Sequence, residues 1–244
     1  MSANISKSRE RFISQAESAF GRPLRPQERK VALQFNGTVL KLALESLSGG
    51  EIAEMVSGAV RDTGSVSLLE HLASGTDSVA ACRQRLLGFL KPGERRVAAS
   101  FHFEGELERF SVWFIALLRS DPLPSTIRAL NFGLFQSDGG CKLYVTGANA
   151  YDADDSDWAC AKDWWPQGRY APLQGLAEIF QALHKAGAEA WVVAQAFAIL
   201  LIRALFEAHS SEIKALMGKK RLFLASGFDD GDLYAINTPV TRRA

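Results

Sequence analysis

The sequence has few cysteines and no apolar run long enough to cross a membrane. Its three cysteines, Cys82, Cys141 and Cys160, are widely spaced and odd in number, whereas a secreted disulfide scaffold carries a dense, even set. The most apolar stretch, residues 190–202, already contains Gln195, and a membrane span needs roughly 18 to 20 apolar residues. We therefore expect a protein of the reducing cytoplasm in which residues 190–202 form a buried helix.

The chain also lacks an excess of charge of either sign. It has 28 Lys plus Arg and 27 Asp plus Glu, for a formal net charge of +1. This balance predicts no general attraction to nucleic acid or to anionic lipid. Residues 7–11 are basic, but the segment after them is amphipathic rather than continuously apolar, so we expect no secretory signal.

Catalytic signatures are missing as well. The four histidines, at positions 71, 102, 184 and 209, show no ligand spacing, and Cys160 has no base beside it in the sequence. No G-x-S-x-G motif, phosphate-binding loop or dinucleotide fingerprint occurs. The sequence therefore favours a protein that is not an enzyme and that needs neither a cofactor nor a metal ion.

Residues 1–92 have the apolar spacing of helices, punctuated by glycine and proline. The pattern predicts a helical unit with helices over residues 4–20, 26–47, 51–60, 68–73 and 77–90. Loops are expected between them, one of them at residues 62–65. The Lys-Pro-Gly-Glu sequence of residues 91–94 predicts the boundary of this unit.

Residues 93–244 are predicted to form an α+β unit. Apolar residues alternate over residues 96–103, which predicts a strand. Residues 107–118 are rich in Phe and Trp and fit either a helix or a strand, of which their aromatic and β-branched residues favour the strand. Further strands are expected at 127–135 and 141–146, which form a hairpin, and at 221–225 and 233–236. Helices are predicted at 173–184 and 188–217. Because hairpins dominate, we expect a mostly antiparallel sheet with one long buried helix, and the helical unit packed on it.

Residues 151–166 contain five Asp and three Trp. Like charges repel one another and Asp extends helices poorly, so we expect a surface loop. The simplest interpretation is a solvated loop whose tryptophans fold back over the core. A calcium-loop register would take residues 152, 154, 156, 158, 160 and 163 as ligands, but Asp157 stands where that loop needs glycine. We therefore predict no metal at this segment.

A second acidic turn, residues 228–234, repeats this mixture of Asp with aromatic residues. It is either an ordinary hairpin between two edge strands or part of one surface with residues 151–166. Aromatic side chains with an acidic rim suit the recognition of a basic protein surface. The predicted contact residues are Tyr151, Asp152, Asp154, Asp155, Asp157, Trp158, Trp164, Trp165, Asp229, Asp230 and Asp232.

The leading hypothesis is therefore a cytoplasmic protein-binding protein. Its most concrete form is an immunity-type or antitoxin-like inhibitor that blocks a basic toxin domain, with no membrane or direct nucleic-acid partner. One alternative is a metal-assisted hydrolase that uses Asp152, Asp154, Asp155 or Asp157. Another is a scaffold whose helical unit dimerises.

Overall fold

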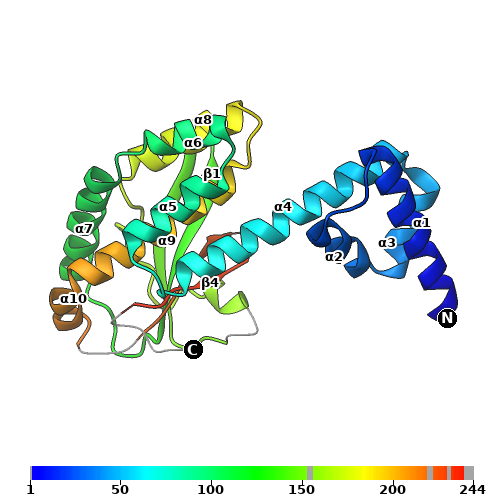
Figure 1. Ribbon diagram of the computed structural model, residues 1–244. Helices are drawn as coiled ribbons and strands as arrows, with labels where there is room; N and C mark the ends of the chain where they lie inside the picture. The colour runs from blue at the N-terminus through cyan, green and yellow to red at the C-terminus, as the bar shows by residue number, and fades with distance from the viewer. Residues whose placement is uncertain (1, 153–155, 219–221, 230–231, 239–244) are drawn as a thin grey trace. The chain divides into compact units, whose positions relative to one another are not determined.

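The computed structural model describes residues 2–152, 156–218, 222–229 and 232–238 (Figure 1). The chain divides into two compact units, residues 1–67 and residues 68–244. This division falls earlier than the predicted boundary at residue 92. Residues 68–92 belong to the second unit because α5 (Val79–Phe89) packs against α9 (Ala190–Ala208).

The first unit is helical, as predicted. It contains α1 (Ser2–Phe20), α2 (Pro26–Gln34), α3 (Gly37–Ser46) and the first part of α4 (Gly49–Ala73). Its core is apolar and includes the fully buried side chains of Phe12, Leu40, Ile52 and Val56.

Two boundaries in this unit differ from the prediction. The single helix expected over residues 26–47 is broken between α2 and α3, where the Asn36 side chain accepts hydrogen bonds from the backbone N–H groups of Thr38 and Val39 and starts a new helix. The prediction of a loop at residues 62–65 is wrong, because α4 continues through these residues. The Thr63 hydroxyl donates a hydrogen bond to the Ala59 carbonyl of the same helix, so this polar side chain is compatible with the helix.

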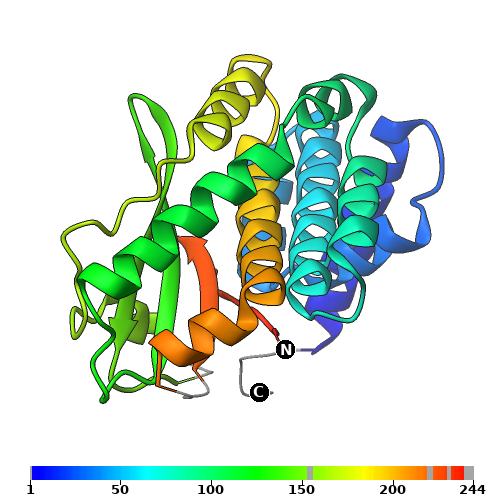
Figure 2. The ribbon, with the colours of Figure 1, turned by 90° about the vertical axis from the view of Figure 1, so that its left-hand side faces the viewer.

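The second unit has the predicted α+β fold. Four strands, β1 (Ala129–Ser137), β2 (Gly140–Ala148), β3 (Phe223–Phe228) and β4 (Tyr234–Ala235), form a sheet in the order β2-β1-β3-β4. The β1–β2 hairpin is confirmed. Both β1–β2 and β3–β4 are antiparallel, but β1 and β3 pair in parallel, so the sheet is mixed. Figure 2 shows α7 (Phe103–Ser120) and α9 on the near face of this sheet.

Two strand predictions are wrong, since residues 96–103 and 107–118 lie in or beside α6 (Pro92–Ala99) and α7. The Glu94 side chain accepts from the Lys91 backbone N–H and starts α6. In α7 the buried residues recur at helical spacing, and Phe110 and Phe114 both contact the ring of Phe132. Burial of one helix face against the sheet outweighs the β propensity of these aromatic residues.

The helix α9 is the buried helix that the sequence predicts. The apolar run is longer than residues 190–202 alone indicate: by length and composition the whole helix is apolar enough to cross a membrane, which corrects the sequence expectation, yet 89% of that segment is buried inside the protein. It ends at Ala208, and α10 (Ser210–Leu216) follows as a separate helix rather than as a continuation to residue 217. The helix α8 (Gln174–Lys185) packs against both α9 and β2, and a short 3-10 helix, η1 (Ser156–Cys160), lies against β2.

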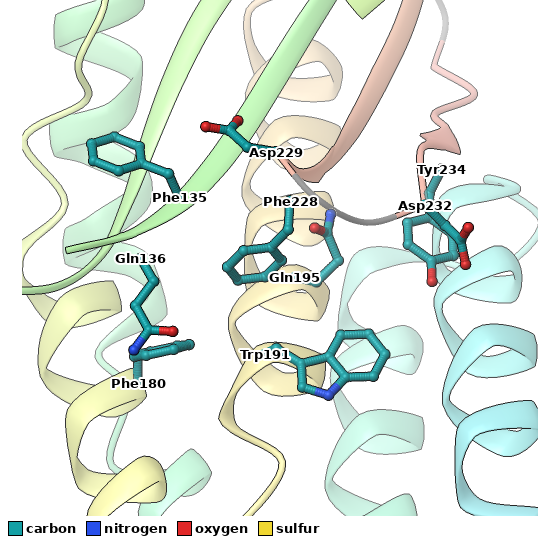
Figure 3. A pocket seen from close by; sticks show the side chains of 9 residues that line it. All are labelled: Phe135, Gln136, Phe180, Trp191, Gln195, Phe228, Asp229, Asp232 and Tyr234. Carbon is teal, nitrogen blue, oxygen red and sulfur yellow. The ribbon is translucent and has the colours of Figure 1, made fainter. Parts of the chain in front are cut away.

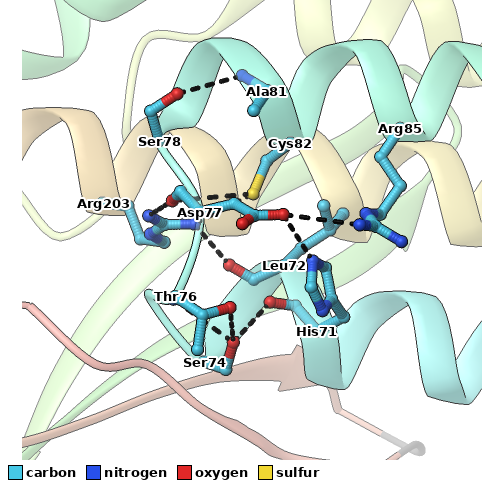
Figure 4. A network of polar contacts seen from close by, with 10 residues as sticks. All are labelled: His71, Leu72, Ser74, Thr76, Asp77, Ser78, Ala81, Cys82, Arg85 and Arg203. Carbon is cyan, nitrogen blue, oxygen red and sulfur yellow. Dashed lines mark hydrogen bonds and ion pairs between the residues drawn. The ribbon is translucent and has the colours of Figure 1, made fainter.

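One charged residue of α9 is fully inside the protein. Arg203 is 1% exposed. Its guanidinium donates to the Leu72 carbonyl at 2.8 Å and to the Asp77 carbonyl at 2.5 Å, and it approaches the Cys82 sulfur at 3.3 Å (Figure 4). It therefore ties α9 to the end of α4 and to the start of α5. A second layer of polar contacts around Asp77 lies nearer to solvent, where Arg85 and His71 approach its carboxylate.

We expect Arg203→Met to lower the free energy of unfolding by about 3 kcal/mol, because it removes the guanidinium hydrogen bonds to the Leu72 and Asp77 carbonyls inside the protein. Urea denaturation measures the loss. Arg85→Met serves as the control, since its half-exposed ion pair with Asp77 should contribute only a small fraction of that amount. Equal losses in the two variants would contradict a special role for Arg203.

Candidate functional site

The predicted acidic and aromatic segment is only partly at the surface. Tyr151 stacks on Phe223 with the ring centroids 4.4 Å apart, and Trp158 meets the same ring edge-on at 5.6 Å. Both side chains are half-buried. They cover Ala129, Phe223 and Ala225, at the beginning of β1 and β3.

Trp164 lies inside the protein. Its side chain is 4% exposed, its backbone pairs with Gly147 of β2, and its indole N–H donates to the Asp121 carboxylate at 3.3 Å. Trp165 is different, with 42% exposure and with the cations of Arg169 and Lys162 over its ring. The aromatic residues of this segment therefore have separate roles, and two of the three tryptophans pack on the sheet.

The carboxylates of the segment do not form one cluster in the part of the chain that the structure describes. Asp152 and Asp157 are exposed, whereas the Asp163 carboxylate accepts from the backbone N–H of Asn149 at 2.8 Å. The predicted contact residues Asp154, Asp155 and Asp230 lie outside the described residues. Within the described ranges, no three His, Cys, Asp or Glu side chains are grouped closely enough to hold a metal ion.

The two acidic segments lie at opposite ends of β3. Tyr151 and Trp158 contact Phe223, the first residue of that strand, while Asp229 directly follows Phe228, its last residue. At about 3.3 Å per residue, these ends are roughly 17 Å apart. The second turn is therefore separate from residues 151–166, and it borders a cleft.

The cleft lies at the carboxyl ends of β1 and β3 and has a volume of about 720 Å³ (Figure 3). Five of its lining side chains are aromatic, and among the described residues only Asp229 and Asp232 line it with a charge. The lining residues are Phe135, Gln136, Phe180, Trp191, Gln195, Phe228, Asp229, Asp232 and Tyr234. The described chain thus encloses an aromatic cleft with an acidic rim.

The parallel pairing of β1 and β3 explains where this cleft forms. Parallel strands end at the same edge of a sheet, which is where open sheets commonly bind ligands. Phe135 and Phe228 come from these strand ends, Phe180 from α8, and Trp191 and Gln195 from the first turns of α9. The chain then returns as β4 with Tyr234, which closes the other side.

This return requires a glycine at position 227. A Cβ atom there would lie 2.4 Å from the carbonyl oxygen of Asp232, which is too close for any side chain. The close approach of Asp232 to β3 places the second rim carboxylate beside the cleft. Figure 3 shows Asp229 near Phe228 and Asp232 near Tyr234, with Gln195 between them.

Tyr144 of β2 holds the first rim carboxylate. Its hydroxyl donates a hydrogen bond to Oδ1 of Asp229, and its ring lies directly over Gly133, where no side chain interferes. The pKa of Tyr144 is raised above its usual value of 10.0, mainly because the phenol is buried. The hydrogen bond to Asp229 and the negative charge of that carboxylate raise it further. Burial, followed by the charges of Asp232 and Glu70, raises the pKa of Tyr234 to about 12. The rim carboxylates are thus next to phenols that stay protonated.

The floor of the cleft contains a short chain of hydrogen bonds. The Gln195 amide nitrogen donates to the Ser226 hydroxyl at 2.9 Å, and that hydroxyl donates to the Phe132 carbonyl at 2.8 Å. Gln195 is 1% exposed and its Oε1 atom has no hydrogen-bond partner among the described residues. The cleft therefore has a polar atom at its base as well as at its rim.

Sequence reasoning named Asp229 and Asp232 but missed most of the cleft. Phe135, Phe180 and Trp191 carry only the signal of ordinary core residues. Gln195 had a visible signal, because it is the one polar residue within the apolar stretch 190–202. A lone amide in such a stretch indicates a buried hydrogen bond or a ligand contact.

No protein-family model, curated protein or solved structure matches the chain. By its fold and its site, the chain is an α+β protein with an aromatic cleft and an acidic rim.

We expect Gly227→Ala to destabilise the protein by about 2 kcal/mol or more, because the added methyl group must displace the backbone at Asp232. Chemical denaturation measures the effect. Gly88→Ala is the control, since nothing lies within 4 Å of its added Cβ and alanine favours the helix. A Gly227→Ala protein as stable as the wild type would contradict the close contact.

We expect Asp229→Asn to lower the pKa of Tyr144, because the neutral amide no longer disfavours the phenolate. The pKa should stay above 10.0, since the phenol remains buried. An alkaline titration of phenolate absorbance measures the change, and Tyr144→Phe identifies the signal. Asp232→Asn should instead lower the pKa of Tyr234. An unchanged Tyr144 titration in Asp229→Asn would contradict the contact.

Proposed function

We propose that the protein is a non-enzymatic binding protein that holds a basic partner protein against the cleft at the ends of β1 and β3. The observation that supports this proposal most directly is the lining of the cleft, in which Asp229 and Asp232 are the charged residues among the described ones and the walls are aromatic. A few residues carry most of the binding energy of protein interfaces, and Trp and Tyr are enriched among them, while charged rims steer and orient the partner.

The rim is suited to this role because it is exposed and in part preorganised. Asp229 and Asp232 are both accessible to a partner. The hydrogen bond from Tyr144 fixes the orientation of Asp229 before any partner arrives. A carboxylate that is already oriented loses less conformational entropy on binding.

The segment around Trp158 is a second, more distant part of the proposed surface. Asp152 and Asp157 are exposed near the other end of β3. A stable interface covers about 800 Å² on each partner, which is wide enough to reach both ends of a short strand. Trp165 contributes differently from the prediction, since Lys162 and Arg169 place positive charge over its ring.

An inhibitor of the immunity or antitoxin type remains the most concrete form of this proposal. Its support is chemical, because a toxin that acts on nucleic acid presents a basic surface that an acidic cleft would block. Three unpaired cysteines, two of them buried, support a location in the reducing cytoplasm.

A pair of charge reversals tests the proposal. We expect the wild type to bind a lysine-rich peptide that contains one aromatic residue, with an affinity that falls as salt concentration rises. Asp229→Lys combined with Asp232→Lys should weaken this binding at least about tenfold, while the protein stays folded and loses at most the stability of the exposed Tyr144–Asp229 hydrogen bond. Isothermal titration and thermal denaturation measure the two quantities.

The matched control is Glu108→Lys combined with Glu178→Lys, which changes the net charge equally at exposed sites that do not line the cleft. Asp152→Lys combined with Asp157→Lys tests the distant segment in the same way. If the Glu108 and Glu178 double variant weakens peptide binding as much as the Asp229 and Asp232 double variant does, the loss of binding comes from overall charge. That result would overturn the proposed site.

A further inference from the structure

The orientation of the Gln195 amide is fixed by its neighbours. The Ser226 hydroxyl has one hydrogen, and it gives that hydrogen to the Phe132 carbonyl. Toward Gln195 it can therefore only accept, so the amide nitrogen of Gln195 must face it. This leaves Oε1, an acceptor, on the other side of the amide.

That acceptor lacks a partner although it is buried. Gln195 is 1% exposed, lines the cleft, and has no hydrogen bond to Oε1 among the described residues. Figure 3 shows the amide beside the Phe228 ring and near Trp191. Buried polar atoms are nearly always hydrogen-bonded in folded proteins, so an unsatisfied one in a cleft indicates the position of a ligand donor.

The walls between the rim and this acceptor suit a flat apolar group. The rings of Phe180 and Phe228 are 6.4 Å apart between centroids and tilted by 38° to each other. Phe135 and Trp191 complete this aromatic zone. An aromatic ring packs well among such rings, with favourable edge and offset contacts.

The charges are at the rim and not at the base. Asp229 and Asp232 are exposed, whereas Gln195 offers only a neutral oxygen. An ammonium group pushed to the base would lose its water without gaining a carboxylate, which is unfavourable. A neutral N–H or O–H donor suits the base, and a cation suits the rim.

We infer that the cleft takes a tyrosine or tryptophan side chain of the partner protein, whose O–H or N–H donates to Gln195 and whose neighbouring lysine or arginine contacts Asp229 and Asp232. This inference deepens the proposed function and rests on it. Tyrosine and tryptophan are also the residues most enriched among interface anchors.

Matched peptides test the inference on the unmodified protein. The probes are heptapeptides with two lysines at each end and a serine on each side of a central residue, which is tyrosine, phenylalanine or O-methyltyrosine. The tyrosine peptide should bind at least about fivefold more tightly than the other two, because only tyrosine supplies the donor that Gln195 lacks. Isothermal titration measures the three affinities.

The variant Gln195→Leu provides the complementary measurement. It removes the acceptor, so the tyrosine and phenylalanine peptides should bind with equal affinity, and the phenylalanine peptide should bind at least as well as it does to the wild type. A circular dichroism spectrum and a melting curve check that the variant is folded. A loss of the tyrosine preference in this variant supports the inference independently of absolute affinity.

The outcomes separate the two proposals. If the tyrosine and phenylalanine peptides bind the wild type equally, and binding still depends on Asp229 and Asp232, the inference about Gln195 is overturned and the proposed function stands. If the tyrosine preference persists in Gln195→Leu, the inference is likewise overturned. If none of the lysine-rich peptides binds, both proposals fail.

Discussion

The packing of α9 against the parallel strands β1 and β3 is the constraint on which the second unit depends. Phe206 of this helix contacts Phe132 of β1, and the helix is buried from Val192 to Phe206. Only two side chains in that buried stretch are polar, and each joins α9 to another element. Arg203 binds the backbone at Leu72 and Asp77, and Gln195 binds Ser226. The same helix therefore organises the core, the link to α5 and the base of the cleft.

The sequence was informative where local patterns agree with the tertiary environment. The β1–β2 hairpin was predictable from its glycine-containing turn, and α9 from its apolar composition. The segment that became α7 was not, because its aromatic residues favour strands locally while their helical spacing lets one face pack on Phe132. The parallel pairing of β1 with β3 could not be predicted from the sequence either, because it depends on contacts between distant parts of the chain.

The candidate site shows the same limit. Composition alone drew attention to residues 151–166, yet Trp164 is buried and Tyr151 and Trp158 rest on the sheet. The shorter acidic turn after β3 lies beside the cleft instead, because Gly227 lets the chain fold back closely. Charge patterns identify acidic segments, but only the positions of Phe135, Phe180 and Trp191 show which segment has an aromatic cavity next to it.

The pairing of residues 129–134 with residues 223–228 has a consequence for synthesis of the protein on the ribosome. The hairpin and the helices between these strands can form on the emerging chain, but the central pair of the sheet must wait until residues 223–228 have left the exit tunnel. Contacts so distant along the chain also close slowly, because they require a large loss of chain entropy. The walls of the cleft therefore assemble only after residues 223–228 have been made, later than the hairpin and the helices that precede them.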